Sequence, residues 1–414
     1  MARTIPALLG GAILLLAAAP AAAQPATSQA VRTERVRIDK ARIDRALAQM
    51  VASGRAAGAS ALVWQDGAER YFGAAGFADR EAGRPMRRDA ILQIYSMTKP
   101  VTGVALMQLW EQGRFGVDDP LALHLPEYAG VKVLTKDGTL RPPARPILVR
   151  DILRHTAGFG YDQEPLAPQN DLAEMSRQVA GAPLLYEPGS EWRYSIAVDV
   201  QARLVEKLAG VAFETYVQRN ILEPLRMGET GWSQPAERLP RFAATYVRKD
   251  GQLVRQDHAT TRRLNFAPKR LTMGGAGLAG PIDDYMRFAR MLLNEGELDG
   301  VRILKPSTVR LMATDHLDPQ MRTRHFLPTK GQVGFGFDFA VRTARPASAE
   351  ENRGAVGEFF WDGAQSTLFW VDPANRLTAV FFVQTVPFDG TLHKDIRAAV
   401  YGPDYLGPAG DARR

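Results

Sequence analysis

The stretch from residue 93 to residue 110 most constrains what this chain can fold into, because it predicts a buried helix that begins beside a hydroxyl group. Pro100 lacks an N–H and fits only the first turn of a helix, so the helix is expected to start at about Ser96 or Met97. Apolar residues then recur at helical spacing, and Gly113 supplies a stop. Ser96 is therefore expected on a rigid scaffold, at the positive end of the helix dipole.

Lys99 follows Ser96 at a spacing of three residues, which places both side chains on one face of the helix. A lysine in an apolar pocket loses proton affinity and can act as a base toward a serine. This Ser-x-x-Lys pattern is typical of penicillin-binding proteins and serine β-lactamases. The pattern alone has a second interpretation, a helix N-cap followed by a surface lysine.

Residues 1–23 are typical of a secretory signal, with Arg3 as the only charge, an apolar run over 8–19 and small residues before Gln24. We therefore expect a periplasmic or secreted protein without a stable membrane anchor, and an uncleaved anchor is the alternative. The chain has no cysteine, so neither a disulfide nor a lipid-modified cysteine can hold it.

The charge distribution argues against a nucleic-acid partner. The net charge of +7 is spread along the chain without a run of like charges, which indicates a mildly basic solvated surface. The six histidines show no metal-ligand spacing, so we expect no metal and no cofactor. The expected partner is a small-molecule ester, and the sequence leaves the oligomeric state open.

Strand patterns lie near both ends of the chain, and helix patterns dominate its middle. An Asp66-Gly67 turn between apolar runs predicts an N-terminal hairpin, and further strands are expected over 334–343, 355–360, 366–371 and 377–383. The predicted class is α/β (α+β): an antiparallel sheet from both termini, flanked by helices, with a mostly helical insertion. The expected parts are a signal peptide (1–23), a linker (24–35), the sheet domain (36–98 and 265–402), the helical domain (99–264) and a tail (403–414).

Five segments, in order, resemble signatures of the class C β-lactamase superfamily, and within it family VIII carboxylesterases most closely. They are Ser96-Met97-Thr98-Lys99, Leu153 to Gly158, Pro188-Gly189 followed by Tyr194-Ser195, Gly274 to Asp284, and Trp361-Asp362-Gly363. The resemblance spans about residues 36 to 402 and implies a β-lactamase/transpeptidase-like fold. It also implies a serine hydrolase that forms an acyl-enzyme on Ser96.

The resemblance further implies roles for the residues that match the signatures. Tyr194 would carry a proton between Ser96 and the leaving group, beside Lys99. The backbone N–H groups of Ser96 and Ala364 would form the oxyanion hole. Four residues would contact the substrate: Ile196, Trp361, Asp362 and Gly363.

Two departures from the superfamily pattern bear on the substrate. Ile196 replaces the asparagine of Tyr-x-Asn, and Trp361 replaces the lysine of Lys-Thr-Gly, so an anionic β-lactam or peptide terminus loses polar contacts. Trp361 offers a flat apolar wall for an ester instead. Asp362 is expected either to repel acidic substrates or to point into solvent. His155 ends a helix and is expected to pack rather than act as the base of a Ser-His-Asp triad.

The sequence thus predicts a secreted serine hydrolase, a carboxylesterase for short-chain or neutral esters. The alternatives are a β-lactamase or D-alanyl-D-alanine carboxypeptidase, an acyltransferase, and a catalytically silent penicillin-binding-like module.

Overall fold

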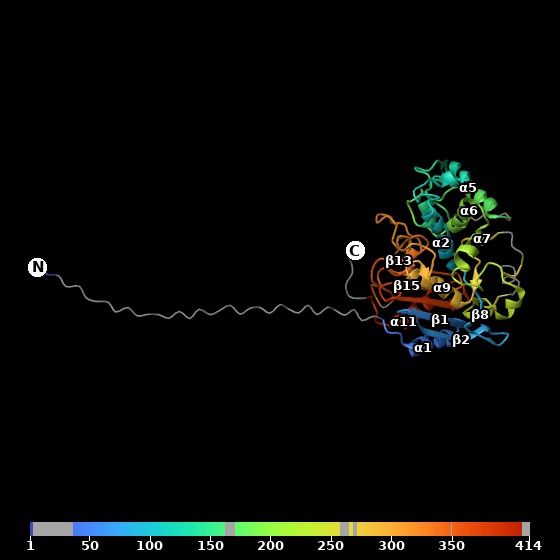
Figure 1. Cartoon of the computed structure of the whole chain (residues 1–414), viewed down its shortest axis with the longest axis vertical. Helices are drawn as coiled ribbons and strands as arrows, with labels where there is room; N and C mark the ends of the chain where they lie inside the picture. Colours follow the sequence, from blue (N-terminus) through green and yellow to red (C-terminus); the bar gives the residue numbers. More distant parts are fainter. Residues whose placement is uncertain (3–35, 162–169, 257–264, 268–270, 349, 408–414) are drawn as a thin grey trace. The chain divides into compact units, whose positions relative to one another are not determined.

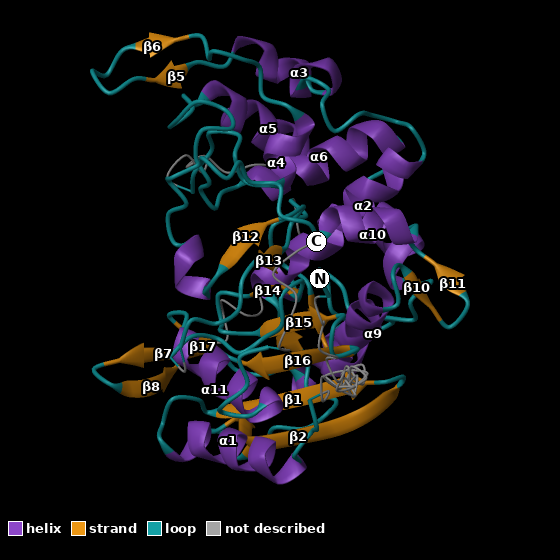
Figure 2. Cartoon of the chain, turned by 90° about the vertical axis from the view of Figure 1, so that its left-hand side faces the viewer, coloured by secondary structure: helices purple, strands orange, loops and turns teal. Residues whose placement is uncertain are grey.

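An eight-stranded antiparallel sheet joins the two ends of the chain, in the strand order β12-β13-β14-β15-β16-β1-β2-β3 (Figures 1 and 2). Its strands are β1 (Gly58–Gln65), β2 (Ala68–Asp79), β3 (Arg84–Pro85), β12 (Val333–Phe335), β13 (Ala340–Arg342), β14 (Phe359–Asp362), β15 (Leu368–Asp372) and β16 (Leu377–Val383). The computed structural model describes residues 1–2, 36–161, 170–256, 265–267, 271–348 and 350–407. The sheet confirms the predicted fold class.

The N-terminal hairpin forms where the Asp66-Gly67 pair predicts it. Asp66 has φ 51° and Gly67 has φ 76°, the pair of positive φ values that a two-residue type I′ turn requires. On its other side β1 pairs with β16, with Ala59 opposite Val383, so residues more than 300 positions apart become neighbours in one sheet.

Helices from both chain ends cover the sheet. Helix α1 (Lys40–Ala52) packs on β1, β2 and α11 (Gly390–Tyr401), and it buries Ile43, Leu47 and Met50 at helical spacing. Helix α9 (Ile282–Leu293) packs on β15, β16 and β1. Every residue of β16 is buried, as expected of a strand covered on both faces.

The serine-containing stretch leads into helix α2 (Thr98–Glu111). A single 3₁₀ turn, Tyr95–Met97, precedes it, and Pro100 lies in its first turn, as predicted. Helix α2 packs against α6 (Ala197–Ala209) and α7 (Phe213–Val217) and is buried along most of its length. The other helices are α3 (Leu121–His124), α4 (Val149–Leu153), α5 (Leu172–Gly181) and α10 (Pro306–Met312).

The remaining strands are short: β4 (Leu92–Gln93), β5 (Val133–Leu134), β6 (Leu140–Arg141), β7 (Tyr246–Lys249), β8 (Gln252–Arg255), β9 (Ala279–Gly280), β10 (Glu297–Leu298), β11 (Val301–Arg302) and β17 (Thr385–Val386). All described residues after Glu34 belong to one unit, residues 35–414. Its division into a sheet domain and a helical domain stays a prediction, and the predicted signal peptide lies almost wholly outside the described residues. None of the helices in the described ranges combines the length and the apolar character needed to cross a membrane.

One predicted strand, residues 334–343, is wrong as a single strand. The chain turns between β12 and β13 at Asp338, whose φ is 61°. The Asp338 N–H donates to the Leu153 carbonyl, and its Oδ1 accepts a hydrogen bond from Gln201 Nε2 at 3.0 Å. Residues from other parts of the chain hold this turn, so the local apolar pattern did not reveal it.

Candidate active site

Ser96 and Lys99 meet at the N-terminal end of α2. The Lys99 ammonium donates to Ser96 Oγ at 3.2 Å and to the carbonyl oxygen of Gly275 at 2.7 Å. Lys99 is only 2% exposed, whereas Ser96 is half-buried. A buried amine within hydrogen-bond distance of a more accessible hydroxyl is the geometry of a nucleophile with its base.

The backbone just before Ser96 is strained. Tyr95 has φ 47°, a conformation that a bulky side chain adopts only when its surroundings enforce it. Gln365 Nε2 donates to the Tyr95 hydroxyl at 3.2 Å, and the Met97 N–H donates to the Ile94 carbonyl at 3.0 Å. These contacts fix the direction in which Ser96 leaves the backbone.

Gly275 links the lysine to a buried carboxylate. Its N–H donates to Asp199 Oδ1 at 3.1 Å, while its carbonyl accepts from Lys99. A Cβ at this position would lie 2.7 Å from Asp199 Oδ2 and 3.1 Å from Lys99 Nζ, so only glycine fits without a shift. Burial raises the pKa of Asp199, and the charge of Lys99 opposes this rise. The sequence showed a glycine-rich turn here but not its contact with Lys99.

Tyr194 lies beside Lys99, as its place in the motif set predicts. The Lys99 ammonium is 4.7 Å from the centroid of the Tyr194 ring, and Trp361 Nε1 donates to the Tyr194 hydroxyl at 3.2 Å. The rings of Phe326, Trp361 and His155 surround the Tyr194 ring, with centroids 5.5, 5.1 and 4.8 Å away. The structure therefore brings Ser96, Lys99, Tyr194 and Trp361 into one site.

His155 supports Tyr194 from below. It is fully buried, and its Nδ1 lies 3.2 Å from Ser195 Oγ, so its printed partner is this serine and not Ser96. Burial, reinforced by the charge of Lys99, holds the pKa of His155 well below its usual range. A neutral, buried imidazole packed against Tyr194 fits a structural role.

The end of β14 runs against the segment that carries Ser96. A Cβ on Gly363 would lie 2.5 Å from the Ile94 carbonyl oxygen, so glycine permits this close approach. Ala364 follows as an exposed residue next to this contact. Ile196 is buried immediately before α6. The oxyanion role of Ser96 and Ala364 and the substrate contact of Ile196 and Gly363 stay predictions.

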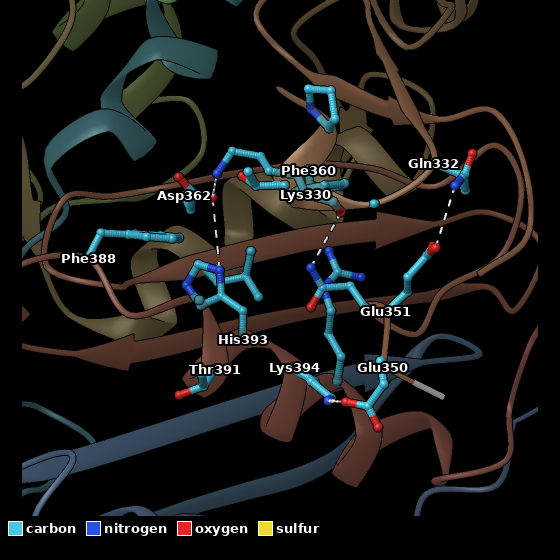
Figure 3. Close-up of a pocket in the computed structure, with 17 residues that line it drawn as sticks. Lys330, Gln332, Glu350, Glu351, Phe360, Asp362, Phe388, Thr391, His393 and Lys394 are labelled. Carbon is cyan, nitrogen blue, oxygen red and sulfur yellow. Dashed lines mark hydrogen bonds and ion pairs between the residues drawn. The ribbon is translucent and has the colours of Figure 1, made fainter. Parts of the chain in front are cut away.

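Asp362 departs from both outcomes that the sequence suggested. It is neither an unpaired anion nor a solvent-facing one, because it is 7% exposed and forms an ion pair with Lys330 (Figure 3). His393 Nδ1 lies 3.9 Å from the same carboxylate. Lys330 comes from a 3₁₀ turn, Leu327–Lys330, and no motif in the sequence points to it.

His393 gives the folded state a specific pH dependence. Burial lowers the pKa of His393 to about 4, and its Nε2 donates to the Ser366 carbonyl at 2.8 Å. Because the folded-state pKa lies below the unfolded value of about 6.5, the unfolded chain takes up a proton first, and His393 costs stability as the pH falls from 6.5 toward 4. This cost is about 2 kcal/mol at pH 5.

We therefore expect His393→Gln, which keeps a donor for Ser366, to lose about 2 kcal/mol less unfolding free energy than the wild type between pH 7 and pH 5. Urea denaturation at both pH values measures this difference, and comparing the two proteins cancels the contributions of other groups. Equal losses in the two proteins would show that His393 titrates normally.

Comparisons with known proteins agree with this geometry. The family model described as Beta-lactamase matches residues 43–401. Protein Rv1367c of Mycobacterium tuberculosis is 34% identical over 375 residues, covering 86% of this chain and 92% of its own length. Esterase EstB of Burkholderia gladioli is 30% identical over 387 residues, covering 85% and 93%. The structure of EstCE1, described as a hydrolase with promiscuous acyltransferase activity, superposes with a TM-score of 0.74 at 27% identity and covers 87% of this chain and 98% of EstCE1.

Proposed function

Because this chain belongs to the beta-lactamase family, we propose that it is a serine carboxylesterase that cleaves short-chain, uncharged esters through an acyl-enzyme. The observation that carries the proposal is the buried Lys99 ammonium, 3.2 Å from Ser96 Oγ and 4.7 Å from the Tyr194 ring. The esterase among its relatives supports the reaction type. The signal-like segment 1–23 supports a location outside the cytoplasm, in the periplasm or medium.

In the proposed acylation, Ser96 Oγ attacks the ester carbonyl as Lys99 takes its proton. The carbonyl oxygen becomes an oxyanion held by the N–H groups of Ser96 and Ala364, an arrangement commonly worth a few kcal/mol in the transition state. The C–O bond to the alcohol then breaks, and Tyr194 passes a proton to the alcohol oxygen. The alcohol leaves, and the acyl group stays on Ser96.

Deacylation repeats these steps with water as the nucleophile. A water molecule at the place of the departed alcohol gives a proton to the Lys99 and Tyr194 pair as its oxygen attacks the acyl carbon. The bond to Ser96 Oγ breaks, and Oγ regains a proton. The carboxylic acid leaves, and the free enzyme is restored.

A small apolar hollow supports the preference for short acyl groups. It has a volume of about 50 Å³, lies next to Tyr95 and the Gly275 loop, and is lined by Gln93, Tyr95, Met273, Ala276, Gly277 and Leu278. Since a water molecule occupies about 30 Å³ in the liquid, this hollow accommodates only a short alkyl group. Leu278 is fully buried at its wall, so a long chain could enter only by displacing packed residues.

Trp361 supports an ester over an anionic β-lactam. Its indole is 1% exposed and stands where the Lys-Thr-Gly lysine of the resembling enzymes would offer an ammonium group. The nearby ammonium of Lys330 is neutralised by Asp362. An anionic substrate therefore loses its water of hydration without gaining an unpaired cation.

A series of p-nitrophenyl esters from acetate to decanoate, measured beside nitrocefin, tests this proposal. We expect kcat/KM to be at least tenfold higher for the butanoate than for the decanoate, and at least 100-fold higher for the butanoate than for nitrocefin. Ser96→Ala serves as the background control. Comparable turnover of nitrocefin would favour a β-lactamase, and a stable acyl adduct without turnover would favour a binding module.

An acyltransferase is a second candidate, because EstCE1 is described as having this activity beside hydrolysis. It uses the same residues, with an alcohol instead of water attacking the acyl group on Ser96. Adding a primary alcohol to the ester assay and measuring the new ester by chromatography separates the two, since a transferase makes more ester than acid at millimolar alcohol.

A further inference from the structure

A cavity of about 250 Å³ lies between β14, the turn Leu327–Lys330 and helix α11 (Figure 3). Strand β14 contributes Phe360 and Asp362, and α11 contributes His393 and Lys394. Polar and carboxylate side chains, Gln332 and Glu351 among them, line the part of the cavity away from β14. None of the mechanistic steps proposed above uses this cavity.

Only one layer of aromatic rings separates this cavity from Tyr194. Strand β13 pairs with β14 at Phe359 and Phe360, and Lys330 approaches β14 beyond that pairing. The Lys330 ammonium is 5.0 Å from the Trp361 ring centroid and 5.5 Å from that of Phe326. Both rings also contact Tyr194, with centroids 5.1 and 5.5 Å from its ring. Two independent contact paths thus connect Tyr194 to Lys330.

The inner wall of the cavity carries two charges that cancel. Lys330 and Asp362 form an ion pair whose side chains are 8% and 10% exposed. The neighbouring His393 is neutral near pH 7, because burial lowers its pKa to about 4. The other lysine of the lining, Lys394, forms an ion pair with Glu350, whose side chain is 83% exposed. The wall nearest Tyr194 is therefore polar, desolvated and without net charge.

We propose that this cavity is the subsite for the alcohol part of the ester, and that the Lys330–Asp362 pair makes it select uncharged alcohols. The inference rests on the proposed function, in which Tyr194 protonates the leaving alcohol. The alcohol oxygen must then lie at the Tyr194 hydroxyl, and its remote end extends past Trp361 toward Lys330. The acyl group lies in the separate hollow beside Tyr95.

The neutral selection follows from the pairing. An anionic alcohol would meet the Asp362 carboxylate, and a cationic one the Lys330 ammonium, at a place too buried for water to screen either charge. An uncharged polar alcohol meets neither repulsion and retains hydrogen-bond partners in the lining. Removing the charge of one partner should therefore reverse the selection in a direction that depends on which partner changes.

Three aryl acetates test this inference: phenyl acetate, its 4-sulfonate and its 4-trimethylammonium derivative. Each kcat/KM is divided by the rate of hydroxide-catalysed hydrolysis, which removes differences in intrinsic reactivity. We expect the wild type to favour the neutral ester at least fivefold over both charged esters. Asp362→Asn should raise the ratio of anionic to neutral ester at least fivefold, and Lys330→Gln should raise the ratio of cationic to neutral ester equally.

Two further variants keep the test decisive. Breaking a buried ion pair can cost several kcal/mol of stability, so the double variant with both substitutions provides a neutral pair. It should show both ratios within twofold of the wild type. Asp283→Asn removes one partner of the exposed Arg88 ion pair outside the cavity and should leave the ratios unchanged.

The inference is overturned if the wild type prefers either charged ester, or if the two single variants shift the ratios in the same direction or by less than twofold. These results differ from failure of the proposed function, in which wild-type protein and Ser96→Ala hydrolyse phenyl acetate at the same rate.

Discussion

Replacing Ser96 by alanine is expected to lower kcat for ester hydrolysis by about 10⁴-fold or more, on the scale found when serine hydrolases lose their nucleophile. The Ser96 hydroxyl is the only group within hydrogen-bond distance of the Lys99 ammonium, among the described residues, that can form an acyl-enzyme. Without it, neither Lys99 nor Tyr194 has a proton to move. Burst kinetics with p-nitrophenyl acetate and intact-protein mass spectrometry measure the loss of turnover and of the acyl adduct together.

The fold should survive this change. Ser96 is half-buried and alanine is smaller, so no packed atom is displaced, and the thermal midpoint should stay within about 3 °C of the wild type. Ser60, which is buried in β1, offers a matched control because Ser60→Ala removes a hydroxyl from the sheet and should retain esterase activity. Wild-type activity in a clean Ser96→Ala preparation would remove Ser96 from the mechanism.

Replacing Lys99 by methionine is expected to lower kcat/KM by about 10³-fold, within the range for losing a positioned proton carrier. Methionine keeps the length and the buried apolar stem, but it removes the donor to Ser96 Oγ at 3.2 Å and to the Gly275 carbonyl at 2.7 Å. Attack by Ser96 then lacks a base, while the oxyanion donors remain. Most of the loss should appear in kcat, because Lys99 acts on the reacting serine.

Lys132→Met is the matched control, since Lys132 is exposed and its loss removes the same charge from the surface. It should leave kcat/KM within twofold of the wild type. If Lys99→Met retained more than a tenth of the wild-type activity, the base would have to be another group, and Tyr194 would be the first to test.

The sequence predicted most of the catalytic centre because its parts are local or carried by motifs. The spacing of Ser96 and Lys99 fixes one helix face, and Pro100 fixes where that helix begins. Tyr194 and Trp361 are recognised by their motifs, and the structure places them in contact. By contrast, the roles of Gly275 and Asp199 depend on a loop meeting α2 from more than 170 residues away, which no local pattern encodes.

The electrostatics of the substrate-binding side could not be predicted for the same reason. The sequence offers Asp362 as a negative charge, but its charge is cancelled by Lys330, which reaches it across 32 positions from a turn without a motif. Only the packed structure shows that the two are buried together with His393.

The sequence by itself therefore determined the sheet of both termini, the serine helix and the identity of the nucleophile and its base. These follow from periodicity, turn chemistry and short spacing, which act over a few residues. The tertiary structure decided the turn at Asp338, the contact between Gly275 and Lys99, and the neutral Lys330–Asp362 wall. Each of these depends on charged or polar groups whose energy is set by burial beside a distant partner, and burial is a property of the folded chain.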